Sequence, residues 1–102
     1  MKRVIVTGGS GFLGTNLIAS LQGRGIEVFN VDIAPPPIPN AKSPWKAIDI
    51  LDIAALRGLM VEVKPDAVIH LAARTDLDGQ SPADYLANTD GTRNVIDAAN
   101  TV

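Results

Sequence analysis

The chain of 102 residues is long enough for one domain with a hydrophobic core, and its 46% hydrophobic content and formal net charge of −2 are typical of a soluble globular protein. There is no basic run to bind a nucleic acid, and no apolar stretch approaches the roughly 20 residues that a membrane span needs. The absence of cysteine excludes disulfides, thiolate metal sites and cysteine nucleophiles. We therefore expect a cytoplasmic protein with no metal site, no nucleic acid and no membrane among its partners.

The first predicted elements are a strand and a helix joined by a glycine-rich turn. The strand covers Lys2 to Thr7, a short run rich in β-branched residues. The turn at 8–14 reads Gly-Gly-Ser-Gly-Phe-Leu-Gly. It fits the G-x-G-x-x-G pattern of dinucleotide-binding loops when counted from Gly9, and the G-x-x-G-x-x-G variant when counted from Gly8. Such a loop needs glycine for a sharp turn, for close approach of a diphosphate and for tight packing of helix on strand. We assign these tasks to Gly8, Gly11 and Gly14.

A helix and a second strand complete the first βαβ unit. Apolar residues at three- and four-residue spacing predict the helix over Phe12 to about Gln22, and its unpaired first N–H groups favour a diphosphate. The second strand covers Ile26 to Asp32. Asp32 follows Gly14 by eighteen positions, close to the roughly 20 expected of the acidic residue in a dinucleotide fold. Together these features predict a dinucleotide site, with a plain glycine turn as the alternative.

The next elements again alternate between strand and helix. Prolines exclude helix and central strand from Ala34 to Asn40, which is predicted as a stiff surface connector, with a proline-rich ligand for an adaptor domain as the alternative. The elements that follow are a strand, a helix capped by Asp52, and an apolar strand, expected at Trp45 to Ile48, Ile53 to Val63 and Ala67 to Ala72. Lys64-Pro65 ends the helix.

The last predicted element is a long helix. Ser81-Pro82 supplies its N-cap and first-turn proline, and it runs to about Ala99. The residues available for burial on it are Tyr85, Leu86, Val95, Ile96 and Ala99. The whole pattern predicts an α/β fold in which about four parallel strands are flanked by helices.

Five motifs in order give a family resemblance. They are the glycine loop, Asp32, Asp49-Ile50, His70-Leu71-Ala72-Ala73 and Tyr85-x-x-Asn88-x-x-Gly91-Thr92. With them the whole chain resembles the N-terminal half of an extended short-chain dehydrogenase/reductase, and within that group the NAD-dependent epimerase/dehydratase family. The resemblance implies a partial Rossmann-type NAD(P)-binding domain over residues 1–102, with strand order 3-2-1-4 and without the later strands and the substrate domain.

The resemblance also implies cofactor-binding roles. Asp32 would bind both ribose hydroxyls and repel a 2′-phosphate, and no Arg or Lys follows it before Lys42, so NAD is favoured over NADP. Asp49 and Ile50 would hold the adenine, with the start of a helix as the alternative role. Asn88 would brace the cofactor end of the sheet, or simply lie on the helix surface. The implied cofactor-binding residues are Gly8, Gly11, Phe12, Leu13, Gly14, Asp32, Asp49, Ile50, Leu71, Ala72, Ala73 and Asn88.

His70 is interpreted differently from its neighbours in the fourth predicted strand. Its position within an apolar run and the lack of an apparent metal partner favour a packed or hydrogen-bonded strand residue over a catalytic base. The sequence therefore predicts a structural role for this side chain.

The sequence departs from the family pattern at the catalytic pair. Members of the family use Tyr-x-x-x-Lys to move a proton while NAD takes or returns hydride. Tyr85 is the only tyrosine and is followed at the fourth position by Thr89, so no residue is predicted as catalytic. We expect an inactive NAD-binding fragment of an epimerase, dehydratase or reductase whose full-length form acts on a nucleotide sugar or similar small molecule. The alternative is a non-catalytic dinucleotide-binding regulator, and Tyr-x-x-x-Lys further along the gene would favour the enzyme.

The fourth predicted strand also bears on assembly. A segment as apolar as Val68 to Ala72 is typical of a central strand with neighbours on both sides, yet no fifth strand is predicted. An exposed edge of this kind is prone to pairing. We therefore expect a homo-oligomer in which another copy of the chain covers the free side of this strand.

Overall fold

Four parallel strands form one sheet in the order β3-β2-β1-β4. The computed structural model describes residues 2–37, 43–72 and 86–100, with the backbone alone at 86–89. The strands are β1 (Arg3–Thr7), β2 (Glu27–Val31), β3 (Trp45–Lys46) and β4 (Ala67–His70). The helices are α1 (Phe12–Gly23), α2 (Ile53–Val63) and α3 (Leu86–Ala99). The predicted α/β architecture and strand order are confirmed.

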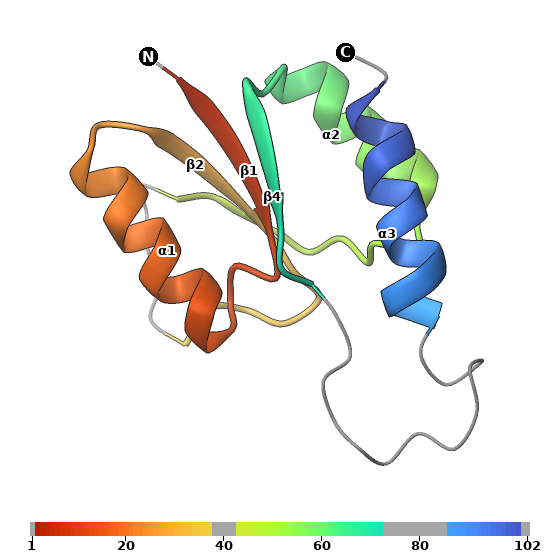
Figure 1. Ribbon diagram of the computed structural model, residues 1–102, viewed down its shortest axis with the longest axis horizontal. Coiled ribbons are helices and arrows are strands. Elements are labelled where there is room, and N and C mark those ends of the chain that lie inside the picture. The colour runs from red at the N-terminus through yellow and green to blue at the C-terminus, as the bar shows by residue number, and fades with distance from the viewer. Residues whose placement is uncertain (1, 38–42, 73–85, 101–102) are drawn as a thin grey trace.

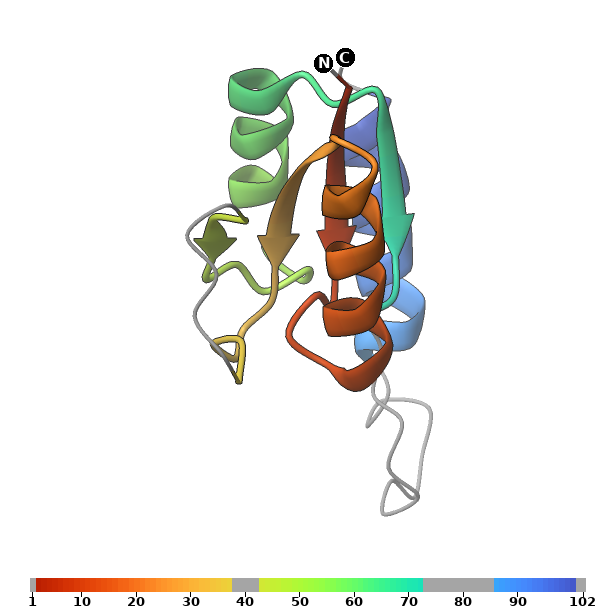
Figure 2. The same cartoon turned by 90° about the vertical axis from the view of Figure 1, so that its left-hand side faces the viewer.

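The sheet lies between two helical layers. Helix α1 covers one face, and α2 and α3 cover the other (Figures 1 and 2). Alternate residues of β1 serve the two layers, because Val4 and Val6 pack with Ile18 of α1 while Ile5 packs with Leu56 of α2. Burial on both faces explains why the strand reads as a continuous apolar run. None of the three helices, as far as the structure describes them, is long and apolar enough to cross a membrane.

Helix α2 begins and ends at the predicted residues. The Asp52 carboxylate accepts a hydrogen bond from the Ala55 N–H at 3.1 Å, which satisfies one of the unpaired donors of the first turn. At the other end, Lys64 takes a left-handed backbone with φ 51° and donates its N–H to the Met60 carbonyl at 2.8 Å. Pro65 follows and has no N–H with which to continue the helix.

The Asp52 cap gives a first prediction. Asp52→Ala should lower the free energy of unfolding by about 1 kcal/mol, because the first turn of α2 loses its side-chain acceptor. Asp52→Asn retains an acceptor oxygen and should cost much less. Urea denaturation of both variants measures the difference, and an equal loss in the two variants would contradict this role.

Two strands end two residues earlier than predicted. Strand β3 stops at Lys46, because the Ile48 N–H turns back to donate to the Lys46 carbonyl at 2.8 Å. Strand β4 stops at His70, because after the Leu71 N–H, which still donates to the Thr7 carbonyl at 2.9 Å, the Ala72 N–H donates to the Thr7 hydroxyl at 3.2 Å. The predicted ends of β1, β2 and α1 differ from the observed ones by a single residue.

Helix α3 packs on α2 with only part of its predicted apolar set. Gly91, Val95 and Ala98 are buried on one side of the helix. Ile96 is 56% exposed, so the expectation of its burial was wrong; it follows Val95 directly and therefore projects from another side of the helix. The predicted helix start at residues 81–85, and with it Tyr85, lies outside the described residues, as does the side chain of Leu86.

Strand β4 lies at one edge of the sheet. It pairs with β1, and no other strand lies beside it within the described ranges. Its residues Val68, Ile69 and His70 are half-buried, whereas most of β1 is fully buried. The covering of this edge by a second copy of the chain stays a prediction.

Candidate functional site

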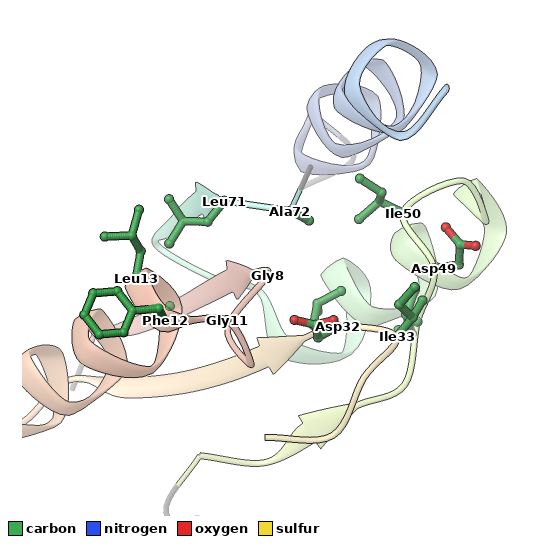
Figure 3. Close-up of a pocket in the computed structure, with 13 residues that line it drawn as sticks. Gly8, Gly11, Phe12, Leu13, Asp32, Ile33, Asp49, Ile50, Leu71 and Ala72 are labelled. Carbon is green, nitrogen blue, oxygen red and sulfur yellow. The ribbon is translucent and has the colours of Figure 1, made fainter. Parts of the chain in front are cut away.

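A cavity of about 670 Å³ opens at the carboxyl ends of the strands, which is where open parallel sheets bind their ligands (Figure 3). The glycine loop, the end of β2, the segment before α2 and the end of β4 surround it. The predicted site residues that line it are Gly8, Gly11, Phe12, Leu13, Gly14, Asp32, Asp49, Ile50, Leu71 and Ala72. Ala73 and the side chain of Asn88 lie outside the described residues.

Gly8 makes the sharp turn out of β1. Its φ of +74° lies in the left-handed region that L residues rarely adopt. A Cβ at this position would also lie 2.7 Å from the Ala72 nitrogen and 2.8 Å from the Leu71 carbonyl carbon. Backbone conformation and space therefore both require glycine here.

Gly14 lets α1 contact the loop directly. It is buried, and a Cβ would lie 2.6 Å from Cα of Gly9. Gly11, in contrast, is exposed and lines the cavity. A Cβ added at this position would have the Gly8 carbonyl oxygen as its nearest neighbour, at 3.5 Å. The protein therefore leaves the backbone at Gly11 open toward the cavity. The environments of Gly8 and Gly14 fit the turn and the close packing that the sequence assigned to them, and the approach of a diphosphate to Gly11 stays a prediction.

The start of α1 faces the same cavity. Gly11 is the N-cap, so the N–H groups of the first turn have no acceptor within the helix. No acidic residue lies in that turn, all of which the structure describes, so no carboxylate of the helix itself opposes the positive end of the helix dipole. Phe12 and Leu13 place their side chains in solvent, with exposed fractions of 84% and 68%. Their backbone is thus suited to an anion.

Asp32 is held opposite the glycine loop. Its Oδ2 accepts from the Ser10 N–H at 3.1 Å, and its Oδ1 accepts from the Ala34 N–H at 3.0 Å. The side chain is half-buried and lines the cavity (Figure 3). Each carboxylate oxygen has room for a further hydrogen bond after accepting one. Asp32 is thus fixed in orientation and still able to accept from a ligand.

Asp49 and Ile50 form the turn that leads into α2. Asp49 Oδ1 accepts from the Leu51 N–H at 2.9 Å, and the Asp49 carbonyl accepts from the Asp52 N–H at 2.8 Å. The alternative role of Asp49 at the start of a helix is therefore observed. Its side chain is also exposed and borders the cavity, while Ile50 is buried in the core.

Helix α3 braces this turn through Asn94, which the sequence reasoning missed, and through Gly91, which it named only as part of the family motif. Asn94 Nδ2 donates to the Ile50 carbonyl at 3.0 Å. Gly91 leaves space for Ile50, whose Cδ1 would lie 2.5 Å from a Cβ at that position. The sequence reasoning gave the bracing task to Asn88. The helical spacing of Gly91 and Asn94 was the signal available for finding them.

Three apolar residues of the cavity were also missed. They are Val31, Ile33 and Ile48, each of which precedes or follows a predicted acidic site residue in the sequence. Ile33 is 70% exposed and offers apolar surface beside the Asp32 carboxylate. Their adjacency in sequence to Asp32 and Asp49 could have predicted that they line the cavity, because residues next to an acid at the end of a strand lie at the same edge of the sheet.

His70 joins β1 to α3 by a chain of hydrogen bonds. The Thr7 hydroxyl accepts the Ala72 N–H at 3.2 Å and shares the Leu71 N–H with the Thr7 carbonyl, and it is hydrogen-bonded to His70 Nδ1 at 2.6 Å. The other ring nitrogen, Nε2, is hydrogen-bonded to Thr92 Oγ1 at 3.0 Å. The interpretation of His70 as a hydrogen-bonded strand residue is confirmed. Burial lowers the pKa of His70 from its ordinary value.

The lowered pKa of His70 predicts acid sensitivity. The unfolded chain binds a proton more readily than the folded chain, so stability should be full above about pH 6.5 and should fall as the pH drops below it. The slope is at most about 1.4 kcal/mol per pH unit. Denaturation between pH 7.5 and 5 measures it, and His70→Gln is the control because the sequence has no other histidine. The same slope in the variant would contradict the assignment.

A parallel sheet in this order, with a glycine loop between β1 and α1, is a Rossmann-type fold. The chain belongs to the NAD-dependent epimerase/dehydratase family, whose family model matches residues 4–102.

Curated relatives and a solved structure agree with this membership. The chain is 34% identical to GDP-6-deoxy-D-talose 4-dehydrogenase of Aggregatibacter actinomycetemcomitans, over 92% of this chain and 29% of the relative. It is 37% identical to 3-beta-hydroxysteroid dehydrogenase of Mycolicibacterium neoaurum, over 96% of this chain and 28% of the relative. UDP-glucose 4-epimerase from Brucella ovis in complex with NAD superposes with a TM-score of 0.83 and 31% identity, over 99% of this chain and 34% of that one. The chain thus spans about a third of the length of the proteins that it matches.

Proposed function

We propose that the chain binds NAD in the cavity at the carboxyl ends of its strands. The observation that carries the proposal is the placement of Asp32, fixed by two backbone N–H groups and facing a glycine loop that has no room for side chains at Gly8 and Gly14. Family membership and a superposable structure containing NAD support it. Bound NAD would supply hydride-transfer chemistry.

Each part of the cavity would hold one part of the cofactor. The N–H groups at the start of α1 would bind the diphosphate, and Asp32 would accept hydrogen bonds from the adenosine ribose. Asp49 and the apolar side chain of Ile33 would contact the adenine. Leu71 and Ala72, followed by Ala73, would let the rest of the cofactor approach the backbone at the end of β4. Asn88 would brace this end of the sheet.

The same arrangement favours NAD over NADP. A 2′-phosphate would meet the Asp32 carboxylate, which both N–H donors hold in place. The sequence offers no cation between Asp32 and Lys42 to neutralise that phosphate. Repulsion without a compensating charge therefore selects the unphosphorylated cofactor.

The activity of the full-length protein is a further part of the proposal. It is an NAD-dependent epimerase, dehydratase or reductase of the cytoplasm, and its substrate is a nucleotide sugar, as the names of two relatives indicate for those proteins. The 102 residues contain no Tyr-x-x-x-Lys, so this chain would not turn substrate over by itself.

The chain would associate with a second copy of itself through the free side of β4. Light scattering of the purified chain tests that association.

Isothermal titration of the chain with NAD and NADP tests the proposed function. We expect saturable binding of NAD at one site and at least tenfold weaker binding of NADP, since one lost charge-assisted contact is worth about 1.5 kcal/mol or more. Failure to bind NAD at millimolar concentration would overturn the proposal. Tighter binding of NADP would overturn the role given to Asp32.

A further inference from the structure

A single serine links the glycine loop to the turn that carries Asp32. The Ser10 N–H donates to Asp32 Oδ2 at 3.1 Å, and the Ser10 hydroxyl donates to the Ala34 carbonyl at 2.8 Å. The Ala34 N–H in turn donates to Asp32 Oδ1 at 3.0 Å. Ser10 therefore holds both the carboxylate and the turn that supports it.

The Ser10 side chain is itself held by a hydrogen bond from Asn30 of β2. Asn30 is 2% exposed, and its Nδ2 donates to the Ser10 hydroxyl at 3.0 Å. The hydroxyl accepts this bond because it gives its own proton to Ala34. Gly9 lies directly on the same amide, since a Cβ there would be 2.7 Å from Asn30 Cγ. The loop backbone thus rests on the Asn30 side chain.

Packing alone does not explain an amide at this position. Oδ1 of Asn30 is buried without a hydrogen-bond partner within the described part of the chain. A buried polar atom of this kind costs stability that an apolar strand residue would not. We therefore take the role of the Asn30 amide to be that of holding Ser10 and the backbone of the glycine loop in place.

The backbone of Asp32 is fixed separately, from the side of β3. Its carbonyl accepts from Trp45 Nε1 at 2.9 Å, and its N–H donates to the Lys46 carbonyl at 3.2 Å. Loss of the Ser10 hydroxyl would leave these two bonds intact. The change would then be confined to the Ala34 turn and the direction of the carboxylate.

We propose that Ser10 and Asn30 are positioning residues that orient the Asp32 carboxylate and thereby set the preference for NAD over NADP. The inference rests on the proposed function. NAD benefits from the fixed carboxylate through its ribose hydroxyls, whereas NADP is repelled by it. If the support from Ser10 or Asn30 is lost, the Asp32 carboxylate can rotate away from the ribose. NAD then binds more weakly than to the parent chain, and NADP is repelled less.

Titration of the full chain and of Ser10→Ala with NAD and NADP tests the inference. The variant keeps the N–H and loses only the hydroxyl, so we expect the Kd for NAD to rise about tenfold, the effect of losing about 1.4 kcal/mol. The Kd for NADP should change by less than about threefold, so that the ratio of the two constants narrows. Ser20→Ala, an exposed hydroxyl deletion on α1, should leave both constants unchanged.

The ratio of the Kd for NADP to the Kd for NAD distinguishes a positioning role from a simple loss of stability. A variant that merely unfolds more readily binds both cofactors less well by the same factor, and its ratio is that of the parent. Asn30→Ala gives a second variant, which should narrow the ratio in the same direction. An unchanged ratio in both folded variants would overturn the inference while leaving the proposed function in place. Absence of NAD binding by the parent chain would instead overturn the proposed function and the inference with it.

Discussion

Gly8→Ala should abolish detectable NAD binding and lower the free energy of unfolding by about 3 kcal/mol. The substitution combines the cost of a left-handed backbone with a Cβ placed 2.7 Å from the Ala72 nitrogen. Relief requires the loop to move away from the end of β4, which opens the turn that faces the cavity. Chemical denaturation measures the first effect and calorimetric titration of the folded variant measures the second.

Gly58→Ala is the matched control. Gly58 lies inside α2, is exposed, and has no atom within 4 Å of the position of a Cβ. Alanine should stabilise the helix by about 0.5 kcal/mol and leave the affinity for NAD unchanged. If both glycine variants lost equal stability, the special geometry of Gly8 would not be the cause.

Asp32→Asn should raise the Kd for NAD by about 10- to 100-fold. The variant loses the charge that strengthens hydrogen bonds from the ribose hydroxyls, a difference of about 1.5–3 kcal/mol. Its amide nitrogen must also face one of two N–H donors, from Ser10 or Ala34, so one of these bonds is lost. The Kd for NADP should rise much less or fall, because the repulsion of the 2′-phosphate disappears.

Glu62→Gln controls for the change in net charge. Glu62 is exposed on α2 and does not line the cavity. Its neutralisation should leave the affinities for both cofactors within about twofold, because exposed charges are screened by salt beyond roughly 10 Å. An equal loss of NAD affinity in the two variants would assign the effect to net charge.

Much of the fold followed from local patterns in the sequence. The apolar runs of β1 and β2, the helical spacing of α1, and the cap at Asp52 each depend on residues close in the chain, and their ends were predicted to within a residue. The turn between β1 and α1 was predictable for the same reason, because it depends on glycines within positions 8–14.

The errors concern the end of one strand and the buried side of one helix. Strand β3 ends early because of a turn at Ile48, and Ile96 is exposed because the contact with α2 uses the other side of α3. Neither outcome can be read from apolar character alone, since the first depends on a local turn of the backbone and the second on which side of α3 meets α2.

The residues that support the site were missed because they act through contacts between distant segments. Asn94 reaches Ile50 from a helix far along the chain, and Asn30 reaches Ser10 from inside a strand that reads as apolar. The sequence identified residues that line the cavity, because their spacing follows a loop and a strand end. It did not identify the residues that hold them, because a buried amide has no signature until its partner is placed.

The most direct test of the account is a titration of the ¹⁵N-labelled chain with NAD, followed by amide chemical shifts. Binding between the glycine loop and the end of β2 predicts the largest shifts at Gly11, Phe12, Leu13 and the Asp32 region, with small ones at Val61 and Glu62 of α2. Saturable shifts that cluster away from the loop, with the amides of Gly11 to Leu13 unmoved, would contradict the central claim.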